Sequence, residues 1–402
     1  MIDTADTPRP VPRWLHAWAI LTACVTVVLL VLGQLVTTFR AGMADPVWPT
    51  EPWYFANNYR SFKVDFGYFV EHTHRIAGFL VGGVVSVLAL GLWLTQPRKN
   101  VRLAGLLALV ALLMAFAEFH RALMLQRDKQ PTEVAWPVGA MAVMATALLA
   151  VLGIAISGVV SRTRGAGVRL LGVIALVAVM VQGLLGGLRV LMNALVGTDL
   201  AAVHGVFAQV VFSVLVAVAV LTGRGPTTEL AQGVRQRVGG GTVLLVVLLF
   251  TQLIWGALVR HDPTPLTQRM HFMTAFLVVA VVVWLLMVGF SNPAVRSRTR
   301  VAGLLLAGFV TLQVALGVEA WMGKFGRYVL PVTEKKIEQD QATIRTLHTL
   351  IGTGILATAV AMSVQVWRRV GSGEKEGPGV DASSNTYDDT RSVGASDTGE
   401  ST

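Results

Sequence analysis

Four histidines occupy the same kind of position in this sequence: each lies just inside the start of a long apolar segment that follows a short polar loop. They are His74, His204, His271 and His348. An imidazole in hydrocarbon is costly without a partner, and it is also a common ligand of haem iron. One histidine of this kind would more often be hydrogen-bonded to headgroups or water. Four, on alternate segments, predict two bis-histidine metal or haem sites, with His74 paired to His204 and His271 to His348.

A second group of residues that could take part in a reaction is the run Glu71-His72-Thr73-His74-Arg75. On a helix, Glu71 and His74 are three positions apart and share a face, whereas His72 points nearly opposite. A carboxylate beside a haem edge in a poorly solvated site can take protons from a C–H bond or from water. The simpler alternative is an ion pair with Arg75 at the membrane surface. We predict a catalytic role for Glu71.

Basic residues near the same ends of the apolar segments could hold haem propionates, which need cations or amides at the polar face. The candidates are Arg75, Arg40, Arg189, Arg260 and Lys324. For each of them, snorkelling or headgroup contact is the alternative. Three further histidines, His16, His120 and His261, are weaker candidates, and we expect them to be solvated rather than liganded.

The elements that must position these residues are membrane-spanning helices. Hydrophobic residues make up 54% of the chain and charged residues 14%, and the mean hydropathy is +0.63, which is typical of integral membrane proteins. In lipid, each segment that crosses the hydrocarbon must be a helix, because every backbone polar group has to be satisfied within it. We expect ten such segments, near residues 14–37, 69–95, 102–120, 136–160, 169–192, 200–222, 241–260, 269–290, 301–322 and 346–367.

The net charge of +10 indicates orientation rather than nucleic-acid binding, because the basic residues collect in alternate loops. By the positive-inside rule these loops and both termini are cytoplasmic, as in a multi-pass protein of a bacterial-type inner membrane. The four histidines then lie near the outer face. The single cysteine, Cys24, excludes a disulfide within the chain,.

A repeat organises the helices. Three segments carry glutamine four residues before glycine, and the next segment in each case opens with its histidine: Gln182 and Gly186, Gln252 and Gly256, Gln313 and Gly317. The first segment has the looser Gly33-Gln34. This predicts an all-α integral membrane protein with eight core helices in duplicated four-helix bundles. The halves are residues 1–96 with 166–223, and residues 239–370; residues 97–165 form an inserted two-helix hairpin, and residues 371–402 a disordered cytoplasmic tail.

At these residues the chain resembles the haem A synthase family. The similarity rests on the E-x-x-H-R motif at Glu71–Arg75, the run QGLLGGLRVL at 182–191 and the run QLIWGALVR at 252–260, each followed by its histidine, and on Gln313, Gly317 and His348. The resemblance implies oxidation of the C8 methyl of haem O to a formyl group, giving haem A for cytochrome oxidase. It also implies that His74, His204 and Glu71 serve the substrate haem O, and that His271 and His348 bind a haem b cofactor.

The chain departs from the family pattern in the first outer loop, residues 37–53, which lacks the cysteine pair of many bacterial members. Thr37 occupies the position where members of the haem A synthase family have an arginine. Arg40, three residues later, is the candidate to replace that arginine. The hairpin has no counterpart. The sequence does not identify the electron acceptor, and it leaves open both a homo-oligomer and an association with haem O synthase.

Two other functions remain open. A non-catalytic di-haem b-type cytochrome needs the same four histidines but not Glu71. A transporter would need an intramembrane polar site, and no Asp, Glu and Lys cluster of that kind is present. Prenyl transfer to haem would need Asp-rich diphosphate-binding motifs, which are absent from the sequence.

Overall fold

The computed structural model describes residues 11–45, 47–50, 53–54, 66–126, 129, 133–192, 199–325 and 339–369. Within these residues the chain forms ten long helices. They are α1 (Arg13–Thr38), α3 (Phe66–Leu94), α4 (Lys99–Met124), α5 (Val138–Val160), α6 (Ala166–Leu191), α8 (Asp199–Thr222), α9 (Gln232–His261), α10 (Pro265–Ser291), α11 (Pro293–Phe325) and α12 (Gln339–Trp367). All ten are long and apolar enough to cross a membrane, which confirms the all-helical, multi-span fold. The predicted tail, residues 371–402, lies outside the described residues.

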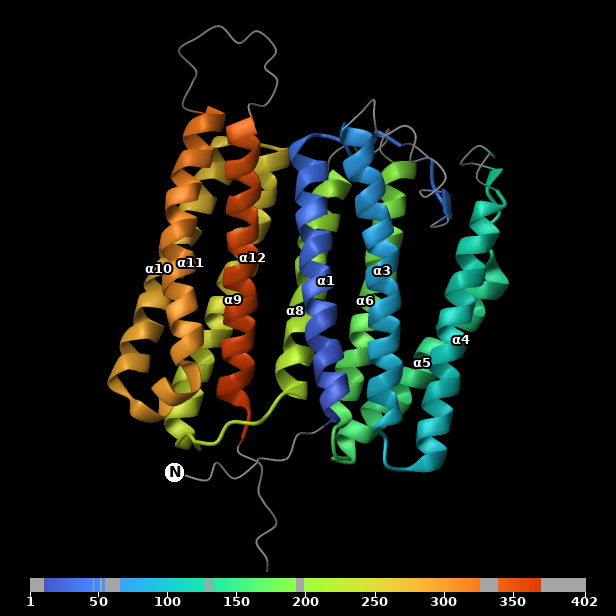
Figure 1. The fold of residues 1–402 in the computed structure, drawn as a ribbon, viewed down its shortest axis with the longest axis horizontal. Helices are drawn as coiled ribbons and strands as arrows, with labels where there is room; N and C mark the ends of the chain where they lie inside the picture. Colours follow the sequence, from blue (N-terminus) through green and yellow to red (C-terminus); the bar gives the residue numbers. More distant parts are fainter. Residues whose placement is uncertain are drawn as a thin grey trace, which may run out of the picture. The chain divides into compact units, whose positions relative to one another are not determined.

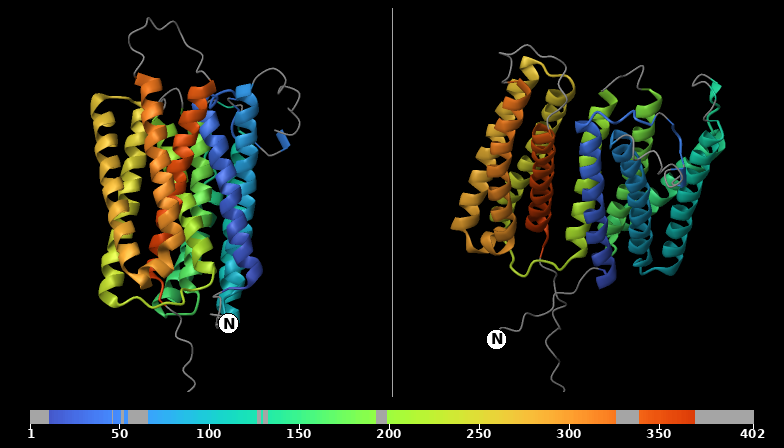
Figure 2. Two further views of the ribbon diagram at one scale, coloured as in Figure 1. Left: turned by 60° about the vertical axis from the view of Figure 1, so that its left-hand side comes forward. Right: turned by 45° about the horizontal axis from the view of Figure 1, so that its top comes forward.

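Eight of the helices form two rings of four. In the first ring α3 contacts α1 and α6, and α8 contacts the same two helices; in the second, α9 and α11 each contact α10 and α12. The two rings lie side by side in Figures 1 and 2. Helices α4 and α5 pack against each other outside the first ring, where they touch α3 and α6. They form a two-helix hairpin beside the first ring.

Each ring has its own apolar core. The first core includes fully buried side chains such as Leu15, Val85, Leu176 and Leu215, and it extends to Leu109 of the hairpin. The second is built from α9 to α12, with Leu245, Leu306 and Ala359 at its centre. The two rings meet through contacts of α1 and α8 with α12, and of α8 with α9. Among the described residues, each ring therefore has a separate apolar cluster within one compact helical unit.

Two helices extend well beyond the apolar segments expected from the sequence. Helix α9 begins at Gln232 instead of near residue 241, and α11 begins at Pro293 instead of near residue 301. A helix that leaves hydrocarbon continues to satisfy its own backbone groups in water, so hydropathy marks where the lipid ends and not where the helix ends. The histidine-bearing α10 begins with a complete capping box between Thr264 and Thr267 and has Pro265 in its first turn,.

Successive helices run in opposite directions, so the connections fall at two ends of the bundle (Figure 1). The end that carries the basic loops is held by arginines bonded to backbone carbonyls. Arg298 of α11 donates to the carbonyls of Thr228 and Arg368, and Arg368 donates to those of Val220 and Gly223. These bonds satisfy carbonyls that end α8 and α12. They tie the linker between the two rings to the second ring.

Candidate functional site

Each of the four predicted ligand histidines packs against a glycine of the preceding core helix. A methyl group added at any of these glycines would lie 3.0–3.2 Å from the Cε1 atom of the facing imidazole, closer than ordinary van der Waals contact. The four pairs are Gly33 with His74, Gly186 with His204, Gly256 with His271, and Gly317 with His348. An alanine at any of these positions would require the facing imidazole to shift by a few tenths of an ångström. The repeat predicted from the sequence is therefore also a repeat of side-chain geometry.

In the three repeats that carry a glutamine four residues before the glycine, the glutamine contacts the same imidazole. The amide nitrogen of Gln252 lies 3.3 Å from Nε2 of His271, and that of Gln313 lies 3.4 Å from Nε2 of His348. Gln182 contacts both ring nitrogens of His204 at 3.2 Å. In three of the four repeats, a glutamine amide nitrogen therefore lies 3.2–3.4 Å from a ring nitrogen of the histidine.

The first repeat differs from the other three. Leu29 occupies the position four residues before Gly33, and His74 bonds to the backbone of Leu29 instead of to a glutamine side chain at this position. Gln34, one residue after that glycine, instead accepts a hydrogen bond of 2.7 Å from Arg260 of the second ring. Arg260 also donates to Thr38 of α1 at 2.7 Å. Gln34 and Thr38 of α1 therefore connect the first ring to the second.

In the second ring, the imidazoles of His271 and His348 face one another. Their ring centres are 6.4 Å apart and their planes are inclined by 67°. Both residues are half-buried, and the Nδ1 atom of each is completely buried. In the first ring, His204 lies close enough to His74 to interact with it electrostatically.

Glu71 joins α3 to the loop that follows α1. One carboxylate oxygen accepts a 2.7 Å hydrogen bond from Arg75 and the other a 2.9 Å bond from the backbone N–H of Asp45. Arg75 also donates to the carbonyls of Asp45 and Val47. The ion pair considered as the simpler alternative is present, but it is not at the surface: the Glu71 side chain is only 5% exposed. Glu71 therefore lies in a buried polar cluster.

Asp45 is the member of this cluster that the sequence did not reveal. Its carboxylate is 3.6 Å from Nε2 of His72 and 3.9 Å from Arg75. His72 is fully buried and lies 4.0 Å, centre to centre, from the ring of Tyr68. His72 thus faces the loop, whereas His74 faces Gly33 of α1. This agrees with the expected opposite orientations of the two histidines.

The predicted propionate partners gather at the histidine end. The guanidinium of Arg189 lies directly over Gly42, where an added methyl group would be 1.9 Å from the nearest nitrogen. Lys324 donates to the carbonyls of Val259 and Arg260. The structure adds Arg345 to this group, with a buried Nε that has no hydrogen-bond acceptor. Four cations at this end form no ion pair with a carboxylate of the described residues: Arg189, Arg260, Lys324 and Arg345.

Arg40 is exposed and adopts a left-handed backbone conformation with φ 54° just after α1. It lies within electrostatic range of Arg345 and Lys324. The remaining histidines lie apart from the four described above. His16 contacts the hydroxyl of Thr222 at 3.1 Å, His120 packs edge-on to Phe79, and His261 ends α9.

Across the part of the chain that the structure describes, no three His, Cys, Asp or Glu side chains come together as ligands for a bare metal ion. The histidine pairs offer two ligands each. In comparisons with known proteins, no family model, curated protein or solved structure matches the chain.

Proposed function

We propose that the chain is a membrane haem oxidoreductase of the haem A synthase type, which converts the C8 methyl group of haem O into a formyl group. The observation that carries this proposal is the separation of 6.4 Å between the ring centres of His271 and His348. Two imidazoles that bind one iron through nitrogens about 2 Å away have ring centres roughly 6 to 6.5 Å apart. A porphyrin supplies the other four ligands, so two histidines suffice.

The difference between the two rings supports the assignment of cofactor and substrate. The second ring offers two equivalent half-sites, each with a glutamine, a glycine and a histidine, which suit a permanently bound haem b. The first ring replaces one glutamine with Leu29 and adds Glu71, the only buried glutamate among the described residues. We therefore propose that His74 and His204 hold haem O, and that His271 and His348 hold haem b.

Four cations at the histidine end fit the carboxylates of the two porphyrins, because none of them forms an ion pair with a carboxylate of the described residues. Arg189 belongs to the first ring, Lys324 and Arg345 to the second, and Arg260 bonds across to the first. A half-buried guanidinium without a carboxylate is costly, and a propionate would neutralise it through charge-assisted hydrogen bonds. We propose these four side chains, together with Arg75 and Arg40, as the propionate partners.

Glu71 is the proposed base. The overall change, CH3 plus H2O giving CHO with four electrons and four protons released, proceeds through two hydroxylations and loss of water from the gem-diol. Haem b supplies one-electron redox chemistry when bound. Glu71 accepts protons near the methyl carbon, Arg75 stabilises its charged form, and the N–H of Asp45 fixes the second oxygen. A carboxylate held in this way is positioned for proton transfer.

One observation favours a second function, electron transfer without catalysis. Both oxygens of Glu71 already accept hydrogen bonds, from Arg75 and from Asp45, as in a purely structural carboxylate. A di-haem cytochrome would keep the four histidines and would not change the substituents of either porphyrin. The identity of the extracted pigment therefore separates the two functions.

The test is pigment extraction from cells that make haem O but contain no haem A. Expression of the intact chain is expected to produce formyl haem, identified by its mass and absorption. Two b-type haems bound to the purified chain, without formyl haem in the extract, would exclude the synthase and support the cytochrome. We place the protein in a bacterial-type inner membrane with both termini cytoplasmic, next to an electron acceptor; a homo-oligomer and association with haem O synthase belong to the same proposal.

Replacing Gly317 with valine is expected to lower haem occupancy of the second ring. A Cβ at this position would lie 3.0 Å from Cε1 of His348, and displacing a packed side chain typically costs about 1–3 kcal/mol. Gly308→Val in the same helix is the matched control, because nothing lies within 4 Å of its Cβ. Absorption spectra of the two purified variants measure the difference. Equal low-spin signals would show that Gly317 does not position His348 for iron.

A further inference from the structure

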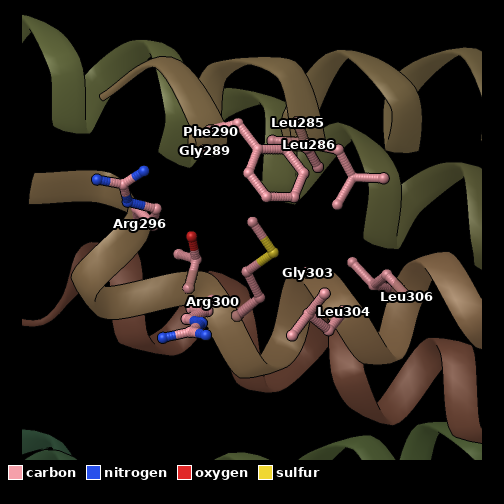
Figure 3. Close-up of a pocket in the computed structure, with 11 residues that line it drawn as sticks. Leu285, Leu286, Gly289, Phe290, Arg296, Arg300, Gly303, Leu304 and Leu306 are labelled. Carbon is pink, nitrogen blue, oxygen red and sulfur yellow. The ribbon is translucent and has the colours of Figure 1, made fainter. Parts of the chain in front are cut away.

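A narrow groove lies at the end of the second ring opposite the histidines. It runs between α10 and α11, and Met362 of α12 closes its floor. Leu285 and Leu306 are buried beneath it, whereas Phe290 and Leu304 on its rim are 61% and 55% exposed. Figure 3 shows the apolar side chains grouped around the groove. The protein therefore presents a lipid-facing surface that is concave here and has a buried apolar floor.

Two glycines keep the groove open. Gly289 of α10 and Gly303 of α11 both line it. A methyl group added at Gly289 would meet only the hydroxyl of Thr299, at 3.7 Å, and one added at Gly303 would lie 3.3 Å from Leu286. The cavity volume within the groove is about 30 Å³. A porphyrin cannot enter, but the side of a slender hydrocarbon chain can.

Two arginines line one end of the groove. Arg296 and Arg300 lie four residues apart on α11, one helical turn, and both are exposed,. In Figure 3 their guanidinium groups lie away from the apolar cluster formed by Phe290 and the leucines. Among the described residues, neither side chain has a hydrogen bond or an ion pair. The neighbouring Arg298, by contrast, is 3% exposed and bonded to carbonyls.

An apolar groove with two arginines at one end favours an anionic amphiphile as its ligand. An apolar channel in a membrane-spanning region takes an acyl chain, and two unpaired cations where the helix leaves the hydrocarbon take a phosphate headgroup. A zwitterionic lipid carries a cation next to its phosphate, which these arginines would repel. We propose that the α10–α11 groove binds one anionic phospholipid, with its phosphate at Arg296 and Arg300 and one acyl chain along Phe290 and Leu304.

The proposal is tested with the full-length chain in detergent, by native mass spectrometry with added phosphatidylglycerol or phosphatidylcholine. The intact chain is expected to retain one phosphatidylglycerol in preference to phosphatidylcholine. Each cation near an anionic headgroup contributes about fivefold to affinity, so Arg296→Gln with Arg300→Gln is expected to weaken binding by about 25-fold. Both side chains are exposed, so the double variant is expected to remain folded, which its helical circular dichroism checks.

Two further variants distinguish the contribution of the apolar groove to lipid binding from that of the two arginines. Gly289→Leu fills the apolar channel while keeping both arginines, and it is expected to abolish the retained lipid. Arg98→Gln with Lys99→Gln removes two exposed cations outside the groove and is expected to change nothing. Equal retention of both lipids, unchanged retention in the arginine or Gly289 variants, or full displacement of the lipid by millimolar inorganic phosphate would each overturn the proposal. None of these readouts depends on haem.

Discussion

Glu71→Gln is expected to abolish the formation of formyl haem while the second ring keeps its haem. Glutamine has nearly the same shape as glutamate and can still accept a hydrogen bond from Arg75, but it cannot take up a proton from the substrate. A positioned general base typically contributes about 10²–10⁴-fold in rate, so formyl haem is expected to fall at least 100-fold. Pigment extraction measures the product, and absorption of the purified chain measures the bound haem.

The control for this prediction is Glu118→Gln. Glu118 also forms an ion pair with an arginine on its own helix, Arg121, at 2.7 Å, but both side chains are more than half exposed. The Glu118→Gln variant should leave both the amount of formyl haem and the bound haem unchanged. A Glu71→Gln protein that forms formyl haem at the normal rate would remove the catalytic assignment, and Glu71 would then be a structural tie between α3 and the loop.

His348→Ala is expected to remove the six-coordinate low-spin signal of the second ring. Groups that only support a metal ligand typically contribute roughly 10–100-fold to affinity, so loss of the ligand itself is expected to lower haem affinity at least about 100-fold. The same change should stop formyl haem formation, because the cofactor site is lost. Absorption and electron paramagnetic resonance spectra of the purified chain report the iron coordination.

His16→Ala provides the matched control, because His16 lies at the opposite end of the bundle, where its ring contacts the hydroxyl of Thr222. It should leave the spectra unchanged. If His348→Ala kept a full six-coordinate signal, the pairing of His271 with His348 would be wrong, whatever the outcome for Glu71.

The sequence by itself determined the ten spans, the repeat of glutamine, glycine and histidine, and the spacing of Glu71 and Arg75. Each of these depends on one helix at a time. In hydrocarbon the backbone has to satisfy its own hydrogen bonds, so apolar length alone specifies a helix. Residues four apart then share a face whatever surrounds them, which is why the pairing of Glu71 with Arg75 could be expected. Its burial could not, because burial depends on the loop that covers it.

Only the tertiary structure decided which side chains meet across helices. Nothing in the local sequence shows that Gln34 bonds to Arg260, that the backbone N–H of Asp45 bonds to Glu71, or that Nε of Arg345 is buried without an acceptor among the described residues. Contacts between helices depend on their rotation and axial offset, which are set by packing over many residues at once. A shift of one residue along α1 would turn Gly33 away from His74. The helices and their repeats follow from local physics, whereas the candidate site is created by the way the helices pack within each ring and between the two rings.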